Sequence, residues 1–190
     1  MKLIIASGNP GKVREIREIL AGKFDEILSM KEAGIDHETV EDGASFAENA
    51  EKKAREIAQL SHCAALADDS GICVTALGGA PGVYSARFAG THGDDAANNR
   101  LLVQKLEGES DRTAHYECAV CLYYPDGSKV EATGELWGEI AKAPSGTGGF
   151  GYDPYFYLPS YGCTVACLSE EEKNRISHRG NALRALLAKL

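Results

Sequence analysis

The chain opens with a strand-turn-helix-strand pattern, and this pattern limits the folds that it can adopt. Residues 2–6 predict a short apolar strand, residues 10–20 a helix and residues 25–29 a second strand. Asn9 is a favourable N-cap, and Pro10 falls at the first helical position, where its missing N–H costs nothing. This order predicts an α/β fold with a largely parallel sheet at its start.

The rest of the chain mixes further helices and strands. Apolar residues that recur with the helical period predict three more helices, over residues 45–60, 94–106 and 179–190. Two apolar stretches, 64–67 and 72–77, predict short strands, and 113–137 predicts two long antiparallel strands around the turn at Pro125-Asp126-Gly127. Because no clean boundary interrupts the pattern, we expect one domain over residues 1–190.

The charge of the chain excludes some partners. The formal net charge of -8 disfavours non-specific binding to DNA or RNA, which depends on excess Lys and Arg. No charged leader precedes an apolar core, and no apolar run approaches the ~20 residues that a membrane span requires. We therefore expect a cytoplasmic, soluble protein that binds neither nucleic acid nor membrane.

The cysteines raise the alternative of a zinc or redox module. Cys118 and Cys121 form a C-x-x-C, but the surrounding segment predicts a strand, on which residues three apart point to opposite faces. Zinc and redox motifs need both sulfurs to converge. We expect all six cysteines to be reduced, and several to be buried as small apolar residues.

The segment "SGNPGK", residues 7–12, has the features of a phosphate-binding turn. Backbone N–H groups at the start of a helix and the positive end of the helix dipole favour an anion there, and Lys12 adds a charge. The segment is not a Walker A loop, because Val13 replaces the hydroxyl residue. Ordinary strand-to-helix turn chemistry explains the same residues equally well.

Two adjacent aspartates, Asp68 and Asp69, follow the apolar stretch 64–67. Ionised carboxylates at the end of an apolar strand need a compensating cation, and Mg²⁺ favours one or two carboxylates together with water and substrate phosphates. The alternative is that Asp68 caps the next turn and Asp69 is solvated. Glu41 is a candidate for another metal ligand, although acidic residues before a helix are also ordinary partners of its dipole. Lys53 is a candidate for a contact with phosphate or with a metal-bound carboxylate, and the alternative is a surface lysine.

Two later segments carry groups suited to a nucleotide. In "GTGGFGYDP", residues 146–154, glycines allow close backbone approach to a flat ligand, and Phe150 and Tyr152 offer rings for stacking on a base. In "EKNRISHRG", residues 172–180, basic side chains fall in the first turn of the last helix, where the dipole disfavours cations. A nearby anion or carbonyl oxygen would explain them. A mobile loop and surface residues are the alternatives.

Together these segments resemble the inosine triphosphate pyrophosphatase family. The resemblance runs through "SGNPGK", "EDGASFAENAEKKA", "ADDSGI", "ALGGAPGVYSARFAG", "GTGGFGYDP" and "EKNRISHRG". It implies an elongated, two-lobed α/β protein with a central mixed β-sheet flanked by helices and an active-site cleft between the lobes. It also implies a homodimer that uses Mg²⁺ to hydrolyse ITP, dITP and XTP to the monophosphate and pyrophosphate.

The resemblance also implies roles for individual residues. Asp69 would bind the metal and accept a proton from the attacking water, and Glu41 would be the second metal ligand. The residues that would bind the nucleotide are Ser7, Gly8, Asn9, Pro10, Gly11, Lys12, Lys53, Ser70, Phe150, Gly151, Tyr152, Asp153, Lys173, His178 and Arg179. Ser7 stands where the family often has threonine, and it keeps the hydroxyl.

The chemistry of the bases makes this specificity intelligible. Hypoxanthine and xanthine carry an oxygen at C6, so donors such as Arg179 and His178 would favour them over adenine. Guanine shares that oxygen, and its rejection must depend on its 2-amino group. Two alternatives are a nucleotide sensor without turnover and a related pyrophosphatase with another base preference.

Overall fold

A computed structural model describes residues 1–190. The chain divides into two compact units. The first unit comprises residues 1–69, 118–134 and 178–190, and the second comprises residues 70–117 and 135–177. The expectation of one domain over residues 1–190 stays a prediction.

The seven strands form one sheet in the order β2-β1-β3-β4-β5-β6-β7. β1 pairs in parallel with β2 and with β3, whereas β6 pairs antiparallel with β5 and with β7. The sheet is therefore mixed, as predicted. The strands are β1 (Lys2–Ile5), β2 (Glu26–Ser29), β3 (Ala64–Val74), β4 (Thr113–Tyr123), β5 (Lys129–Ile140), β6 (Phe156–Leu158) and β7 (Cys163–Thr164).

Five α-helices accompany the sheet; four begin close to the predicted positions, and α4 was not predicted. None of them is long and apolar enough to cross a membrane. The side chain of Asn9 caps the first helix by accepting from the N–H groups of Gly11 and Lys12, and Pro10 is its first residue. The helices are α1 (Pro10–Ile19), α2 (Phe46–Ser61), α3 (Asp95–Lys105), α4 (Glu170–Ile176) and α5 (His178–Leu187).

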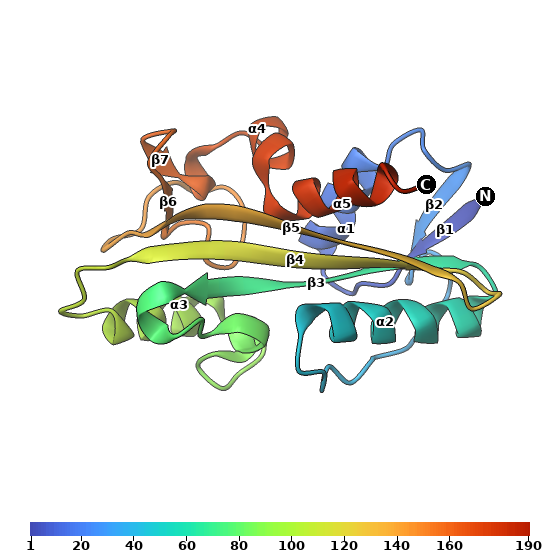
Figure 1. The fold of residues 1–190 in the computed structure, drawn as a ribbon, viewed down its shortest axis with the longest axis horizontal. Helices are drawn as coiled ribbons and strands as arrows, with labels where there is room; N and C mark the ends of the chain where they lie inside the picture. Colours follow the sequence, from blue (N-terminus) through green and yellow to red (C-terminus); the bar gives the residue numbers. More distant parts are fainter. The chain divides into compact units, whose positions relative to one another are not determined.

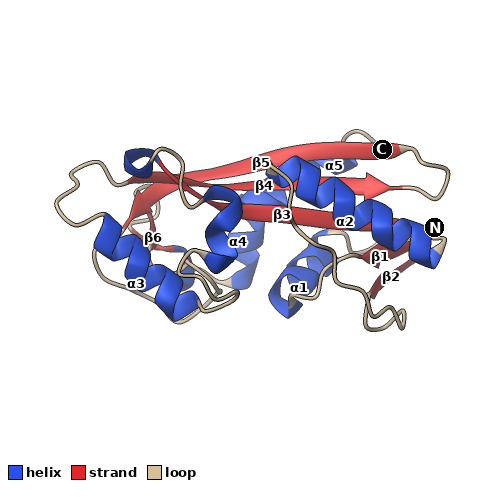
Figure 2. Cartoon of the chain, turned by 90° about the horizontal axis from the view of Figure 1, so that it is seen from below, coloured by secondary structure: helices blue, strands red, loops and turns tan.

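In the first unit, α1 and α5 lie together on one side of the strands and α2 lies on the other (Figure 1). Ile16 of α1 and Leu183 of α5 belong to one buried cluster with Leu3, Ile5 and Leu66 of the sheet. Ile5 is the register partner of Leu66, so β1 carries these apolar side chains beside those of β3. Figures 1 and 2 both show α2 running along β3.

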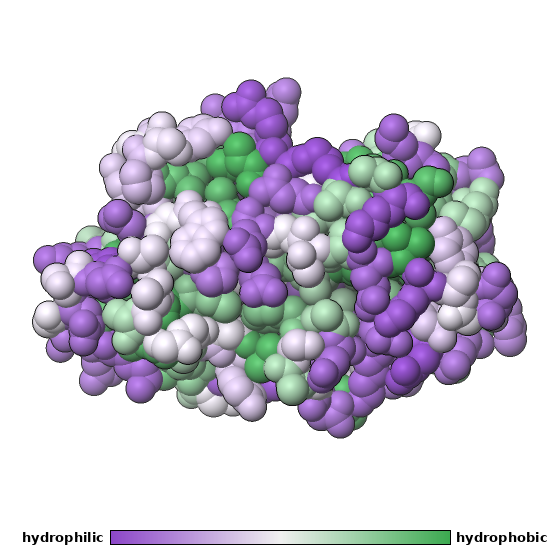
Figure 3. All heavy atoms as spheres, in the orientation of Figure 1, coloured by the Kyte–Doolittle hydropathy of each residue, from purple (hydrophilic) through white to green (hydrophobic).

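In the second unit, a separate buried cluster joins α3 to the strands. Leu102 and Leu106 pack with Ile72 of β3, Tyr116 of β4 and Phe156 of β6. Tyr116 and Phe156 stack with their ring centroids 4.4 Å apart. The surface still shows apolar side chains between hydrophilic ones (Figure 3), as folded proteins generally do because polar groups cannot cover a whole surface.

The structure corrects the position of the two aspartates. The stretches 64–67 and 72–77 were expected to be separate strands, but Ala64–Val74 is one continuous strand. Asp68 and Asp69 therefore lie inside β3 and not at its end, and neither of them caps a turn. The charged pair does not end the strand because both carboxylates find cationic or amide partners, described below.

The hairpin and the cysteines agree with the sequence analysis. β4 and β5 are neighbours joined at the predicted turn, where the N–H of Gly127 donates to the carbonyl of Tyr124. Cys118 and Cys121 are both buried on β4, and burial raises the pKa of each thiol. All six cysteines are free thiols. The C-x-x-C is therefore part of a strand and not a redox turn.

Candidate active site

Asp68 lies at the centre of a buried ion-pair network in the first unit. Its Oδ2 atom is 3.0 Å from Lys12 Nζ and 3.0 Å from Arg179 Nε. Arg179 is only 1% exposed, and its Nη1 donates to Glu15 of α1. This network joins β3, α1 and α5, so Asp68 is held by two cations inside the protein.

Asp69 has a different set of neighbours in the same unit. Its Oδ2 accepts from Asn49 Nδ2 at 2.9 Å, and its Oδ1 lies 3.7 Å from Lys53 Nζ. Lys53 also donates to Glu41 Oε1 at 2.6 Å. Asn49 and Lys53 are one turn apart on α2 and both reach the same carboxylate. The ammonium group of Lys53 therefore lies within reach of both candidate metal ligands.

The surroundings shift the pKa values of the two aspartates in opposite directions. Burial alone would raise the pKa of Asp68, but Lys12 and Arg179 lower it far below its usual range. Burial raises the pKa of Asp69, and the repulsion from Glu41 adds to this, while Lys53 and Lys12 oppose it. A carboxylate whose pKa is raised is the better proton acceptor.

The charges of Asp69, Glu41 and Lys53 also shift one another's pKa values. Burial would raise the pKa of Glu41, but Lys53 outweighs it and lowers that pKa. Burial would lower the pKa of Lys53, but Asp69, Asp68 and Glu41 raise it. Lys53 is therefore the protonated cation of this acidic cluster.

The structure limits the phosphate-binding turn predicted at residues 7–12. The N–H groups of Gly11 and Lys12 donate to Asn9 Oδ1, and the N–H of Asn9 donates to Ser7 Oγ. Most of the backbone donors expected to face an anion thus have partners within the turn. Gly8 has open space around the position that a Cβ would occupy. Lys12 is not a mobile surface charge, because it lies against Asp68.

The loop at residues 146–154 lies wholly in the second unit. It differs from the expectation that its glycines approach a ligand and that both of its aromatic rings stack on a base. A Cβ on Gly149 would come within 2.1 Å of Asp153 Oδ2, and one on Gly146 within 2.4 Å of the backbone of Ala166. These two glycines allow the chain to approach itself and not a ligand. Tyr152 is only 6% exposed, and its hydroxyl donates to the carbonyl of Ser85. Its ring is a core group, so the expectation that it stacks on a base was wrong.

Phe150, Asp153 and Lys173 form a compact group in the second unit. Lys173 Nζ lies 2.7 Å from Asp153 Oδ2 and 4.4 Å from the centroid of the Phe150 ring. Asp153 also accepts from the N–H of Phe150 and from the hydroxyl of Tyr116. Phe150 is half-buried, so its ring remains the one candidate in this loop for stacking on a base.

The other predicted residues are spread over both units. Ser70 is half-buried on β3, directly after Asp69. The N–H of Gly151 donates to Asp95 Oδ2, and its carbonyl accepts from Asn99. His178 is buried and begins α5, with Arg179 second, as the sequence predicted. The contacts of these residues with a nucleotide stay predictions.

Sequence reasoning missed Asn49 and Glu15. Asn49 is 1% exposed, and its Oδ1 accepts from the N–H of Gly43, which turns its amide nitrogen toward Asp69. A signal was present, because Asn49 sits beside Ala50 on the apolar face of α2. Glu15 likewise falls beside Ile16 on the buried side of α1. Polar residues within an apolar stripe indicate buried hydrogen bonds.

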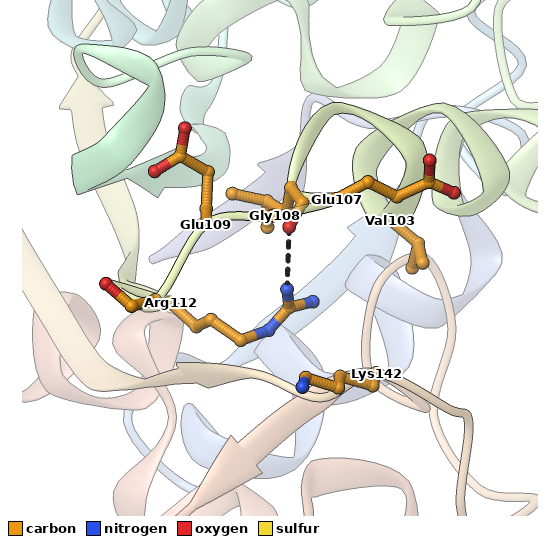
Figure 4. Close-up of a pocket in the computed structure, with 8 residues that line it drawn as sticks. Val103, Glu107, Gly108, Glu109, Arg112 and Lys142 are labelled. Carbon is orange, nitrogen blue, oxygen red and sulfur yellow. Dashed lines mark hydrogen bonds between the residues drawn. The ribbon is translucent and has the colours of Figure 1, made fainter.

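A hollow of about 490 Å³ in the second unit lies apart from all of these residues. Figure 4 shows Arg112 beneath the turn at Gly108, with Lys142 nearby. Arg112 donates to the carbonyls of Leu106, Ile140 and Ala141, so its guanidinium is occupied by hydrogen bonds to the backbone. This hollow is therefore not a second candidate for the active site.

Comparisons with known proteins agree along the whole chain. A model of the Ham1 family matches residues 3–189. A protein of Exiguobacterium sp. named dITP/XTP pyrophosphatase is 50% identical over 190 residues, covering 100% of this chain and 97% of the relative. A protein of the same name from Chromobacterium violaceum is 49% identical, covering 100% of this chain and 96% of the relative.

Solved structures give the same result. The structure of the Staphylococcus aureus Ham1 protein is 40% identical and has a TM-score of 0.89, covering 100% of this chain and 97% of that chain. A Mycobacterium abscessus structure titled nucleoside-triphosphatase / dITP/XTP pyrophosphatase is 44% identical and has a TM-score of 0.78, covering 100% and 99%. The helices and mixed sheet described above are thus shared with solved proteins.

Proposed function

Since this chain belongs to the Ham1 family, we propose that it hydrolyses the non-standard purine nucleoside triphosphates dITP, ITP and XTP. The reaction adds water and breaks one P–O bond between the α- and β-phosphates, which gives the monophosphate and pyrophosphate. The observation that carries the proposal is the position of the Lys53 ammonium, which lies within reach of both Glu41 and Asp69. Relatives that match over the full length bear the corresponding name.

A divalent cation fits the carboxylates of the first unit. Glu41 and Asp69 supply oxygen ligands, which Mg²⁺ prefers, and both already face one cation in the form of the Lys53 ammonium. We propose Mg²⁺ as the cofactor, with these two residues as its protein ligands. When bound, Mg²⁺ would neutralise phosphate oxygens and lower the pKa of a water molecule.

The residues of the first unit would have different roles in the hydrolysis. Asp69 accepts the proton of the attacking water, a role that suits its raised pKa. Asn49 positions the Asp69 carboxylate through its hydrogen bond to Oδ2. Lys53, together with Lys12 and the turn at residues 7–12, would contact the phosphates. Asp68, held by Lys12 and Arg179, fixes the strand that carries Asp69.

Further residues would contact the base. We propose that Phe150 stacks on it and that Lys173 and the backbone near Gly151 offer donors to its oxygens. Ser70, Asp153, His178 and Arg179 keep their predicted contacts with the nucleotide. We further propose that the protein is cytoplasmic and that it is a homodimer, of which the resemblance to the family implies the homodimer. Size-exclusion chromatography with light scattering tests the dimer.

The test of the activity is pyrophosphate release with Mg²⁺ from dITP, ITP, XTP, GTP, ATP and dTTP. We expect the first three to be the best substrates by kcat/KM, because their bases carry the C6 oxygen and lack the 2-amino group of guanine. A preference for a standard or pyrimidine triphosphate would overturn the proposed specificity. Binding of ITP without release of pyrophosphate would indicate a sensor instead.

A further inference from the structure

A second group of metal-binding side chains lies in the second unit. Cys73 of β3 and His115 and Glu117 of β4 each present one ligand atom, and these atoms all lie within 4.8 Å of one another. In a tetrahedral zinc site, bond lengths of about 2.0–2.3 Å place the ligand atoms about 3.3–3.8 Å apart. Side-chain rotations that move the ligand atoms by about 1 Å would therefore bring the three atoms to coordination distance.

The structure holds the imidazole of His115 in a fixed orientation. Its ring stacks on Trp137 of β5, with the centroids 4.3 Å apart. Trp137 is 55% exposed, and its Nε1 donates to Glu135 at 2.8 Å. The His115 Nε2 atom lies 3.9 Å from Glu117, and Nδ1 is buried without a hydrogen-bond partner. The ring is thus oriented by stacking, and a ring nitrogen is left for another ligand.

The charge around Cys73 favours a cation. Burial and the nearby carboxylates of Glu117 and Glu135 raise the pKa of its thiol to about 11. Two carboxylates therefore lie close to a sulfur atom that is half-buried. A divalent ion would compensate this negative charge, and the thiol would lose its proton on binding.

The geometry points to a site for one Zn²⁺-type ion bound by Cys73, His115 and Glu117, and we propose that such an ion binds there. The site differs in chemistry from the acidic cluster of the first unit, which offers oxygen atoms alone. A sulfur, a nitrogen and an oxygen ligand suit Zn²⁺ and Co²⁺, whereas Mg²⁺ requires oxygen. Since the ligands come from β3 and β4, a bound ion would link the two strands.

The test uses Co²⁺ as a probe, because a thiolate bound to Co²⁺ produces charge-transfer absorption in the near ultraviolet. The full chain is treated with a chelator, dialysed and titrated with Co²⁺ in excess Mg²⁺, which saturates the acidic cluster. We expect the absorption to rise to about one equivalent of Co²⁺ and to disappear when Zn²⁺ displaces it. Zn²⁺ should also raise the melting temperature, since it binds the folded state.

Variants identify the ligands. Cys73→Ser removes the sulfur, and His115→Phe removes the nitrogens while keeping a ring that stacks on Trp137. Both should abolish the absorption and the Zn²⁺-dependent rise in melting temperature, and Glu117→Gln should weaken Co²⁺ binding. The matched control is Cys163→Ser, because Cys163 is another half-buried thiol of the second unit outside the cluster. It should behave like the unmodified protein.

Three results would overturn the proposal. The first is an unmodified protein without thiolate absorption, and the second is a Cys73→Ser variant that keeps the absorption. The third is absorption that depends on Cys73 but survives in both His115→Phe and Glu117→Gln, because a single thiol would then be the ligand. Melting curves without metal show which variants fold. Glu117→Gln keeps the size of the side chain and provides the readout if a more disruptive variant does not fold.

Discussion

Asp68 and Asp69 are neighbours in the chain, but they occupy two different environments. Successive residues of a strand point to opposite faces of the sheet. Asp68 meets Arg179 of α5 and Lys12 of α1, whereas Asp69 meets Asn49 and Lys53 of α2. Lys12 and Arg179 lower the pKa of Asp68 in spite of its burial, whereas burial and the repulsion from Glu41 raise the pKa of Asp69. One position stabilises the fold, and the other is suited to accept a proton.

The largest expected effect tests the role of Asp69. Asp69→Asn should lower kcat for dITP by about 10²–10⁴-fold, which is the usual contribution of a general base. The fold should persist, because asparagine keeps an oxygen that can accept from Asn49. The measurement is pyrophosphate release, with melting curves to show that the variant is folded. Asp42→Asn is the control, since Asp42 is an exposed partner of Lys52. Unchanged turnover in Asp69→Asn would remove Asp69 from the mechanism.

The next effect concerns Asp68 and is one of stability. Asp68→Ala leaves the buried guanidinium of Arg179 without one of its two carboxylates, and removing one partner of a buried ion pair typically costs about 3–5 kcal/mol. Urea denaturation measures this as a lower midpoint. Asp36→Ala, at an exposed aspartate, should change stability by no more than about 0.5 kcal/mol. A loss of activity at full stability would place Asp68 in the chemistry instead.

A smaller effect is expected at Lys53. Because Lys53 opposes the rise in the pKa of Asp69, Lys53→Met should raise that pKa further. The acidic limb of the kcat/KM profile should then move to higher pH, since Asp69 must be ionised to accept a proton. The loss of a charged contact should also reduce kcat/KM by roughly ten- to a hundredfold. Lys52→Met, next to it on α2, should leave the profile in place, and an unmoved limb in Lys53→Met would contradict the assignment.

The smallest effect is the pH dependence of stability. The folded pKa of Asp68 lies below its ordinary value of 3.8, so its stabilising contribution is present above that value and is lost as the pH falls below it. The folded pKa of Asp69 is raised, so its contribution is present below 3.8 and is lost as the pH rises through the folded pKa. Denaturation curves from neutral to acidic pH should therefore show a shallower loss for Asp68→Asn than for the unmodified protein. The Asp69→Asn variant should not show this shallower loss of stability towards acidic pH.

The sequence predicted the elements whose contacts are local. Asn9 caps α1 through N–H groups two and three residues further on, and the hairpin closes between Tyr124 and Ser128. Such contacts depend on the identity of a few consecutive residues, so composition and spacing identify them. For Lys53, at the border of an apolar helical face, the sequence offered a phosphate, a metal-bound carboxylate or solvent as the partner, and the structure places it beside Glu41 and Asp69. The start of α2 is equally local, because the side chain of Ser45 accepts from the N–H of Glu48 three residues further on.

The tertiary structure decided what the aspartates and cysteines do. The partner of Asp68 on α5 is 111 residues away in the chain, and that of Asp69 on α2 is 20 residues away. The packing of the helices on the two faces of the sheet selects these partners, and no spacing in the sequence reveals it. The sequence had already predicted that Cys118 and Cys121 are strand residues, but Cys73 meets His115 and Glu117 only because β3 and β4 are neighbours in the sheet. Residue identity determined the local hydrogen bonds, whereas helix packing and strand order determined which charged and metal-binding side chains meet.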